Sequence, residues 1–247
     1  MGGALAQRWQ ELHLCRKLVI VDPASNDVHS SDEVPAAFKP KIIVFAIKPQ
    51  VLSETVDEYK SYAAAGALII SIAAGKSVAF YEKHFGPDVK IIRSMPNTPA
   101  SIGKGITVAY ANKNVTAAEK IRAKTLLGAV GDVLWVDKES LLNPVTALSG
   151  SGPAYVFLLI ETLTRAGIHV GLEPAMAEKL ARRTVIGSAE LAAESASESA
   201  AQLRENVTSK GGTTEAALAI LMADPGIQQI FDRALDAAAK RAEELAG

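Results

Sequence analysis

The chain has 247 residues, of which 49% are hydrophobic and 21% are charged, so it can bury the core of one large domain or two ordinary ones. A formal net charge of −1 and an aromatic content of 5% do not favour a nucleic-acid partner. No apolar run approaches the roughly 18 residues that span a bilayer, and no secretory signal region leads the chain. The single cysteine, Cys15, cannot form an internal disulfide, and we expect a cytoplasmic protein.

The first part of the chain alternates between short apolar runs and helical patterns. Residues 4–14 have apolar side chains at helical spacing, and residues 17–22 (KLVIVD) predict a strand that ends in an acid. Further strands are expected at residues 41–49, 67–75 and 89–97, apolar runs follow at 106–112 and 132–137, and helices are expected at 51–62 and 116–127. Near-continuous apolar strands separated by helices indicate a parallel sheet that helices cover on both faces.

The second part is entirely helical in pattern. After about Asn143 the strand pattern stops, and Ala-, Leu- and Glu-rich stretches follow. Helices are expected at residues 153–167, 174–194, 199–207, 213–223 and 225–246. The sequence therefore predicts an α/β domain over residues 1–143 and an all-α domain over residues 144–247.

The opening residues MGGAL fit the end of a G-x-G-x-x-G dinucleotide-binding turn. Gly2 takes the place of the third glycine, which permits close packing of helix and strand, and Gly3 enters the helix. Asp22 follows about 20 residues later, where an acid binds the ribose 2′-hydroxyl. A disordered start is the alternative, because two glycines are a weak signal. On the first interpretation, the first strand and two glycines are absent from this sequence, and we expect weaker nucleotide binding and lower stability.

Two glycine-rich segments stand out in the helical part. In residues 147–163 (ALSGSGPAYVFLLIETL), small residues precede an apolar helix, which lets a backbone or a flat ring approach, although a tight helix entry explains them as well. In residues 205–218 (ENVTSKGGTTEAAL), glycines lead into a helix start, where free N–H groups bind an anion such as a carboxylate. The alternative is plain capping, with Thr213 as N-cap and Glu215 in the first turn.

Together these segments resemble those of the pyrroline-5-carboxylate reductases. The resemblance covers essentially the whole chain and includes AIKPQ (46–50), SIAAG (71–75), RSMPNTPA (93–100), SGSGPAYVF (149–157) and VTSKGGTT (207–214). It implies a Rossmann-like domain that binds NADPH or NADH, and hydride transfer to the imine of 1-pyrroline-5-carboxylate, which gives L-proline in proline biosynthesis. It also implies that the helical part forms a homodimer, and further a ring of dimers.

The resemblance also implies the roles of individual residues. Thr214 supports the imine nitrogen, and Ser209 shapes the same loop. The substrate carboxylate is expected on the backbone N–H groups of Gly211, Gly212 and Thr213. Lys210 stands where the family commonly has proline, which makes the loop looser and more positive.

The residues expected to bind the cofactor follow the predicted strands or lie in the opening turn. They are Gly2, Gly3, Asp22, Ala46, Ile47, Lys48, Pro49, Ala73, Ala74, Asn97 and Thr98. Lys48 has the alternative of an ordinary surface lysine. Asp22 favours NADH, but Ser25 and Asn26 follow it and leave the choice of coenzyme open. The four histidines, His13, His29, His84 and His169, form no metal-ligand pattern, and no catalytic metal is expected.

Two other functions compete with this one. A catalytically weak or inactive homologue would retain a proline-like pocket without the glycine turn. A β-hydroxyacid type of dehydrogenase would need a lysine in the first long helix of the second half, and residues 153–167 contain none.

Overall fold

The computed structural model describes residues 1–24 and 28–246. Contacts divide the chain into two compact units, which we call unit 1 (Met1–Gly152 together with Ala237–Gly247) and unit 2 (Pro153–Asp236). The domain division at residue 143 stays a prediction. Each unit is described by itself below.

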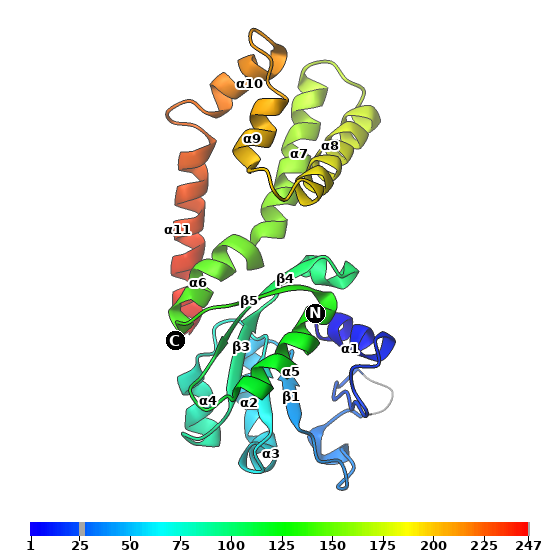
Figure 1. The fold of residues 1–247 in the computed structure, drawn as a ribbon, viewed down its shortest axis with the longest axis vertical. Coiled ribbons are helices and arrows are strands. Elements are labelled where there is room, and N and C mark those ends of the chain that lie inside the picture. The colour runs from blue at the N-terminus through cyan, green and yellow to red at the C-terminus, as the bar shows by residue number, and fades with distance from the viewer. Residues whose placement is uncertain (25–27, 247) are drawn as a thin grey trace. The chain divides into compact units, whose positions relative to one another are not determined.

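Unit 1 is built on a five-stranded sheet whose strands lie in chain order (Figure 1). The strands are β1 (Ile42–Phe45), β2 (Leu68–Ser71), β3 (Ile91–Met95), β4 (Gly105–Ala111) and β5 (Gly131–Trp135). β1, β2 and β3 are parallel, but β4 runs antiparallel to β3. The expected parallel sheet is therefore confirmed for β1 to β3 and wrong for the pair β3–β4, because residues 96–104 are too short a connection for a crossover, which takes a dozen residues or more.

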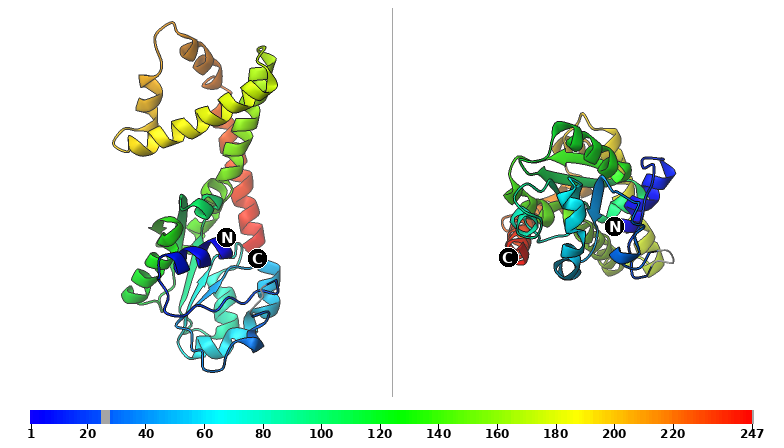
Figure 2. Two further views of the ribbon diagram at one scale, coloured as in Figure 1. Left: turned by 90° about the vertical axis from the view of Figure 1, so that its right-hand side faces the viewer. Right: turned by 90° about the horizontal axis from the view of Figure 1, so that it is seen from below.

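Helices cover both faces of this sheet (Figure 2), which confirms the α/β class. One face packs against α1 (Gly2–Glu11) and α5 (Ala117–Leu127). The other face packs against α2 (Pro49–Thr55), α3 (Lys60–Ala64) and α4 (Val78–Phe85). Every residue of β2 and β3 is buried, which explains their unbroken apolar runs. The helix expected at residues 51–62 is divided by a 3₁₀ turn at Val56–Tyr59.

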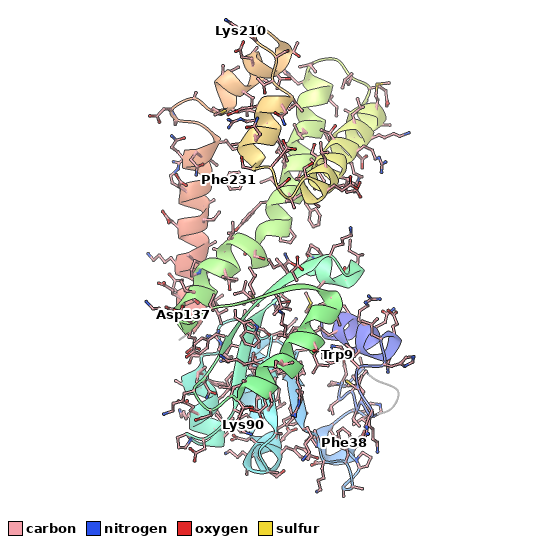
Figure 3. All side chains as sticks on the ribbon, viewed as in Figure 1. Trp9, Phe38, Lys90, Asp137, Lys210 and Phe231 are labelled. Carbon is pink, nitrogen blue, oxygen red and sulfur yellow. The ribbon has the colours of Figure 1, made fainter. Side chains whose placement is uncertain are left out.

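A buried tryptophan anchors α1 to the sheet layer. Trp9 packs in the core, and its indole Nε1 donates a 2.7 Å hydrogen bond to the backbone oxygen of Leu126 at the end of α5 (Figure 3). α5 itself begins with a capping box, in which Thr116 and Glu119 satisfy each other's backbone N–H groups. Trp9 therefore ties α1 to α5, and the first turn of α1 lies beside the carboxyl end of β1, where Gly2 meets Ala46.

The strand expected at residues 17–22 is wrong, because this segment pairs with no strand. In a dinucleotide-binding fold the second strand depends on pairing with the first, and no described strand occupies that place. β1 pairs with β2 on one side only. A groove of about 890 Å³ runs along the other side of β1, between it and residues 14–22.

Unit 2 is helical, as predicted. Its helices are α7 (Gly152–His169), α8 (Pro174–Glu194), α9 (Ala200–Asn206) and α10 (Thr213–Leu221), and α11 (Ile227–Ala246) begins in it. Side-chain caps explain two of the starts, because Glu173 accepts from the N–H groups of Ala175 and Met176, and Ser199 accepts from that of Gln202. Within the described part of the chain, no helix is long and apolar enough to cross a membrane.

Short helical turns join the sheet to α7. α6 (Leu142–Val145) packs Leu142 against Met95 and Val108, and a π-helical turn follows at Thr146–Gly150. A Cβ on Gly150 would lie 3.5 Å from the sulfur of Met95. Gly150 therefore lies beside Met95, and a side chain there would make an ordinary van der Waals contact with it.

The groove beside β1 predicts that an added strand will stabilise unit 1. We expect a variant with a strand of about six apolar residues and a glycine turn before Met1 to unfold about 5 °C or more above the 247-residue chain, because the strand satisfies unpaired backbone groups of β1 and fills the groove. Scanning calorimetry measures this shift. An extension of equal length made of Gly and Ser is the control, and the same unfolding temperature for both extensions would contradict the assignment of the groove.

Candidate active site

The groove beside β1 brings together several residues expected to bind the cofactor. Its lining includes Gly2 and Gly3 from α1, Asp22, and Ala46 and Ile47 after β1. A Cβ on Gly2 would lie 2.8 Å from the Cβ of Ala46, so helix and strand meet there at a distance that only glycine allows. This close approach fits the interpretation of Gly2 as the third glycine of the dinucleotide motif.

The start of α1 offers donors to an anion. Backbone N–H groups in the first turn of a helix have no partner within the helix, and Met1 provides no side-chain cap. Gly3 has open space around the position of a Cβ, so a ligand can approach its backbone closely. A phosphate group fits this donor set.

The charged side chains that line the groove are mostly cationic. They are Arg16, Lys17, Lys39, Lys41 and Arg122, with Asp22 as the acid among them. Lys39 and Lys41 precede β1, so they lie toward the amino end of the strand and not at the edge where the cofactor candidates lie. Asp22 is exposed, and its carboxylate accepts a 2.9 Å hydrogen bond from the N–H of Ala24. Ser25 and Asn26 lie outside the described residues.

The other cofactor candidates follow the carboxyl ends of β1, β2 and β3. Since these strands are parallel, Lys48 with Pro49, Ala73 with Ala74, and Asn97 with Thr98 leave the sheet at the same edge. Pro49 begins α2, and Lys48 precedes it without a capping bond.

Asn97 is held in place by two hydrogen bonds. Its carbonyl oxygen accepts from the N–H of Ile106 at 3.0 Å, and its amide nitrogen donates to the hydroxyl of Ser149 at 3.4 Å. This pairing connects the end of β3 to the small-residue turn before α7. The Asn97 amide therefore has a fixed orientation at the edge where the strands end.

A buried polar network behind Ala73 was not predicted from the sequence. The hydroxyl of Tyr81 donates to Ser71 Oγ at 2.5 Å, and Ser71 Oγ accepts from the N–H of Ala73 at 3.2 Å. Nearby, Arg93 Nη1 donates to Glu139 Oε1 at 2.6 Å. Burial raises the pKa of Tyr81 to about 12, so its hydroxyl keeps its proton at ordinary pH. Arg93 within the apolar run VKIIRSM was the available signal, because a charge in a buried strand needs a partner.

The segment expected to bind the substrate lies in unit 2, between α9 and α10. Figure 3 shows Lys210 on this loop. Gly211 has φ +73°, a left-handed conformation that favours glycine. Gly212, and not Thr213, is the N-cap of α10, so the alternative of Thr213 as cap is wrong. Ser209 and Thr213 are exposed and Thr214 is half-buried.

Two of the backbone amides expected to bind the substrate carboxylate have partners in the chain. The N–H of Gly212 donates to the carbonyl of Ser209 at 3.0 Å. The N–H of Gly211 donates to the carboxylate of Glu215 at 2.6 Å. The N–H groups of Thr213 and Thr214 lie in the first turn of α10, where the helix supplies no acceptor. The Glu215 carboxylate therefore occupies part of the position expected for the substrate carboxylate.

Across the described residues, no three His, Cys, Asp or Glu side chains are grouped so that they hold a metal ion. The candidate residues of each unit offer backbone donors, hydroxyls and small side chains, which suit an anionic ligand.

Comparisons with known proteins identify the family. Residues 139–245 match a family model described as pyrroline-5-carboxylate reductase dimerisation. The chain is 45% identical to the pyrroline-5-carboxylate reductase of Synechocystis over 219 residues, which cover 87% of this chain and 79% of the relative. It is 39% identical to the enzyme of that name from Haemophilus influenzae, over 99% of this chain and 95% of the relative.

A solved structure of a protein of this name is also similar to the chain. The crystal structure of Plasmodium falciparum pyrroline carboxylate reductase with NADP bound superposes with a TM-score of 0.83 at 30% identity, over 100% of this chain and 95% of that one. These levels of identity, over most of both chains, show that this protein belongs to the pyrroline-5-carboxylate reductase family.

Proposed function

We propose that this protein reduces the imine of 1-pyrroline-5-carboxylate to L-proline with NADPH or NADH. The observation that carries the proposal is the Ser209–Thr214 loop, which presents backbone donors and a threonine hydroxyl at a helix start in a chain of this family. A role in proline biosynthesis and a cytoplasmic location belong to the same proposal.

The residues of unit 1 fit a dinucleotide. The first turn of α1 would hold the pyrophosphate, because its backbone N–H groups have no partner within the helix and can bind an anion. Ala46 to Pro49, Ala73 with Ala74, and Asn97 with Thr98 would line the crevice at the carboxyl ends of the strands. When bound, the reduced nicotinamide supplies the hydride that the imine carbon accepts.

The residues of the loop would hold the substrate. The N–H groups of Thr213 and Thr214 bind the carboxylate. The N–H of Gly211 joins them when the Glu215 carboxylate, its present acceptor, moves away. The hydroxyl oxygen of Thr214 accepts a hydrogen bond from the protonated imine nitrogen and so favours the protonated form, whose carbon is the better hydride acceptor. Ser209 shapes the loop through its carbonyl bond to Gly212. The chain's contribution to the rate is then mainly orientation of the imine.

Unit 2 lacks a core of its own, and we propose that a second subunit covers it. Among its described residues, only Ala177 and Ala181 are buried. Its helices expose large apolar side chains, including Val156, Phe157, Leu158, Leu159, Leu163, Met176, Leu180, Leu221 and Phe231. Apolar surface of this extent marks a protein interface. A ring of such dimers is part of the same proposal.

The assignment of Thr214 predicts a specific loss of activity. Thr214→Val is expected to lower kcat/KM for 1-pyrroline-5-carboxylate about 10- to 100-fold, because a hydrogen bond to a charged group is worth about 1.5–3 kcal/mol. The assay follows oxidation of NADPH and of NADH in separate reactions. Thr214→Ser keeps the hydroxyl and should retain most of the activity. A wild-type chain without this activity would overturn the proposed function, and a Val variant as active as the Ser variant would overturn the role of Thr214.

The contact between Glu215 and Gly211 predicts competition with the substrate. Glu215→Gln keeps an acceptor for Gly211 but removes a negative charge next to the expected carboxylate position. We expect KM for 1-pyrroline-5-carboxylate to fall about two- to fivefold, the size of a screened interaction between neighbouring charges. Glu190→Gln on α8 is the matched control. A KM that rises, or that falls equally in both variants, would argue against a shared anion site.

The exposed face of α7 predicts how the dimer can be broken. Phe157 is 64% exposed in the single chain. Placing a charge there with Phe157→Glu should shift the protein from dimer to monomer at micromolar concentration, as measured by light scattering, because an unpaired charge is costly at a buried interface. Ile121→Glu makes the same change at an exposed residue of α5 and should leave the dimer intact. A monomeric wild-type protein would contradict the proposed interface.

A further inference from the structure

We propose that Tyr81 and Glu139 are positioning residues for the cofactor: from opposite ends, they hold the Ile72–Ser77 loop, which carries Ala73 and Ala74, in the shape that receives the nicotinamide ribose. This inference rests on the proposed function. Neither side chain reaches the cofactor itself. Each acts through a hydrogen bond to a residue at one end of the loop.

The first end of the loop is fixed through Ser71. Ser71 is the last residue of β2, and its Oγ accepts from the N–H of Ala73, which bends the chain immediately after the strand. The hydroxyl of Tyr81 donates to the same Oγ at 2.5 Å. Tyr81 is fully buried in the core between α4 and the sheet, so its hydroxyl is held in one place. Ser94 Oγ donates to the carbonyl of Ser71 at 3.1 Å and secures the strand end further.

The second end of the loop is fixed through Glu139. The N–H of Val78, in the first turn of α4, donates to Glu139 Oε1 at 2.7 Å. Arg93 Nη1 donates to the same oxygen at 2.6 Å. Glu139 lies just before α6, in the segment that leads toward unit 2. One carboxylate therefore joins the start of α4, the strand β3 and this connecting segment.

Loss of the Glu139 carboxylate would leave the buried Arg93 without a charge partner. Its side chain is 7% exposed, and its Nε is buried without a hydrogen-bond partner among the described residues. A buried guanidinium that loses its carboxylate leaves an uncompensated charge. The Arg93–Glu139 pair therefore holds Glu139 in the position where it can accept from Val78.

The loop between these two anchors has little freedom. Gly75 has φ +73°, and a Cβ on it would lie 2.5 Å from the backbone oxygen of Leu245. Ala74 packs against the cluster of Met95, Val108 and Leu142. With both ends and the middle fixed, the backbone of Ala73 and Ala74 presents a preformed surface, which lowers the ordering cost of binding.

The test separates cofactor affinity from stability. Tyr81→Phe removes only the hydroxyl, and we expect the Kd of the reduced cofactor, measured by calorimetry with NADPH and with NADH, to rise about fivefold, which corresponds to about 1 kcal/mol for one hydrogen bond. KM for 1-pyrroline-5-carboxylate should change less than twofold. Tyr59→Phe is the matched control, because the Tyr59 ring packs edge-on against Phe45 in the same core, and it should leave the Kd unchanged.

The Glu139 variants give a readout that a purely structural role would not produce. Glu139→Gln keeps an acceptor for Val78 but removes the charge partner of Arg93, so it should lower the unfolding temperature and keep the cofactor Kd within twofold. Glu139→Ala should lower the unfolding temperature and also raise the Kd as Tyr81→Phe does. The double variant Ser71→Ala/Tyr81→Phe should bind no more weakly than Ser71→Ala, since both changes remove the same contact.

Four other outcomes would overturn the positioning role, the proposed function or both. An unchanged Kd in Tyr81→Phe and Glu139→Ala, with lower unfolding temperatures only, would overturn the positioning role. A Kd that follows the unfolding temperature through all variants, Gln included, would also overturn it. A wild-type chain that binds the cofactor but does not reduce the imine would overturn the proposed function alone, and one that binds neither dinucleotide would overturn both.

Discussion

The shared direction of β1, β2 and β3 is the constraint on which the proposed cofactor site depends. Because these strands point the same way, the residues after them leave the sheet at one edge, although about 25 positions separate each strand from the next along the chain. Every residue within β2 and β3 is buried, so the side chains of these strands pack in the core. Only the strand ends are free to carry ligand contacts, and Ala46, Ala73 and Asn97 stand there.

The sequence predicted the structure best where interactions between residues close in the chain determine it. The helices of the second half were predicted to within a few residues, because alanine-rich stretches propagate readily and Glu173 and Ser199 cap their helices from within the sequence. The strands β1, β2 and β3 were also predicted, since burial on both faces leaves an unbroken apolar run. Neither inference required knowledge of distant residues.

The predictions that were wrong or missing concern segments whose structure depends on a partner elsewhere in the chain. Residues 17–22 have the composition of a strand, but a strand exists only when a neighbour pairs with it. The direction of β4 was set by the length of its connection, not by its composition. Arg93 is unusual as a charged residue within an apolar run. Its partner Glu139 lies 46 positions away, and nothing in the sequence around Glu139 indicates that it pairs with Arg93. Local patterns identify a residue that needs a partner without identifying the partner.

The Ser209–Thr214 loop, which we propose as the site for the substrate carboxylate, is held in shape by hydrogen bonds within the chain. Gly211 is the third residue of a turn that the hydrogen bond from the Gly212 N–H to the Ser209 carbonyl closes, its left-handed conformation suits that position, and the carboxylate of Glu215 accepts from its N–H. Because a substrate carboxylate would replace one carboxylate by another, binding exchanges acceptors and avoids ordering the loop anew. The cost is repulsion between two acids at one helix start, which Lys210 next to Gly211 partly offsets. In the proposed site, the Glu215 carboxylate would therefore both order the loop and compete with the substrate carboxylate.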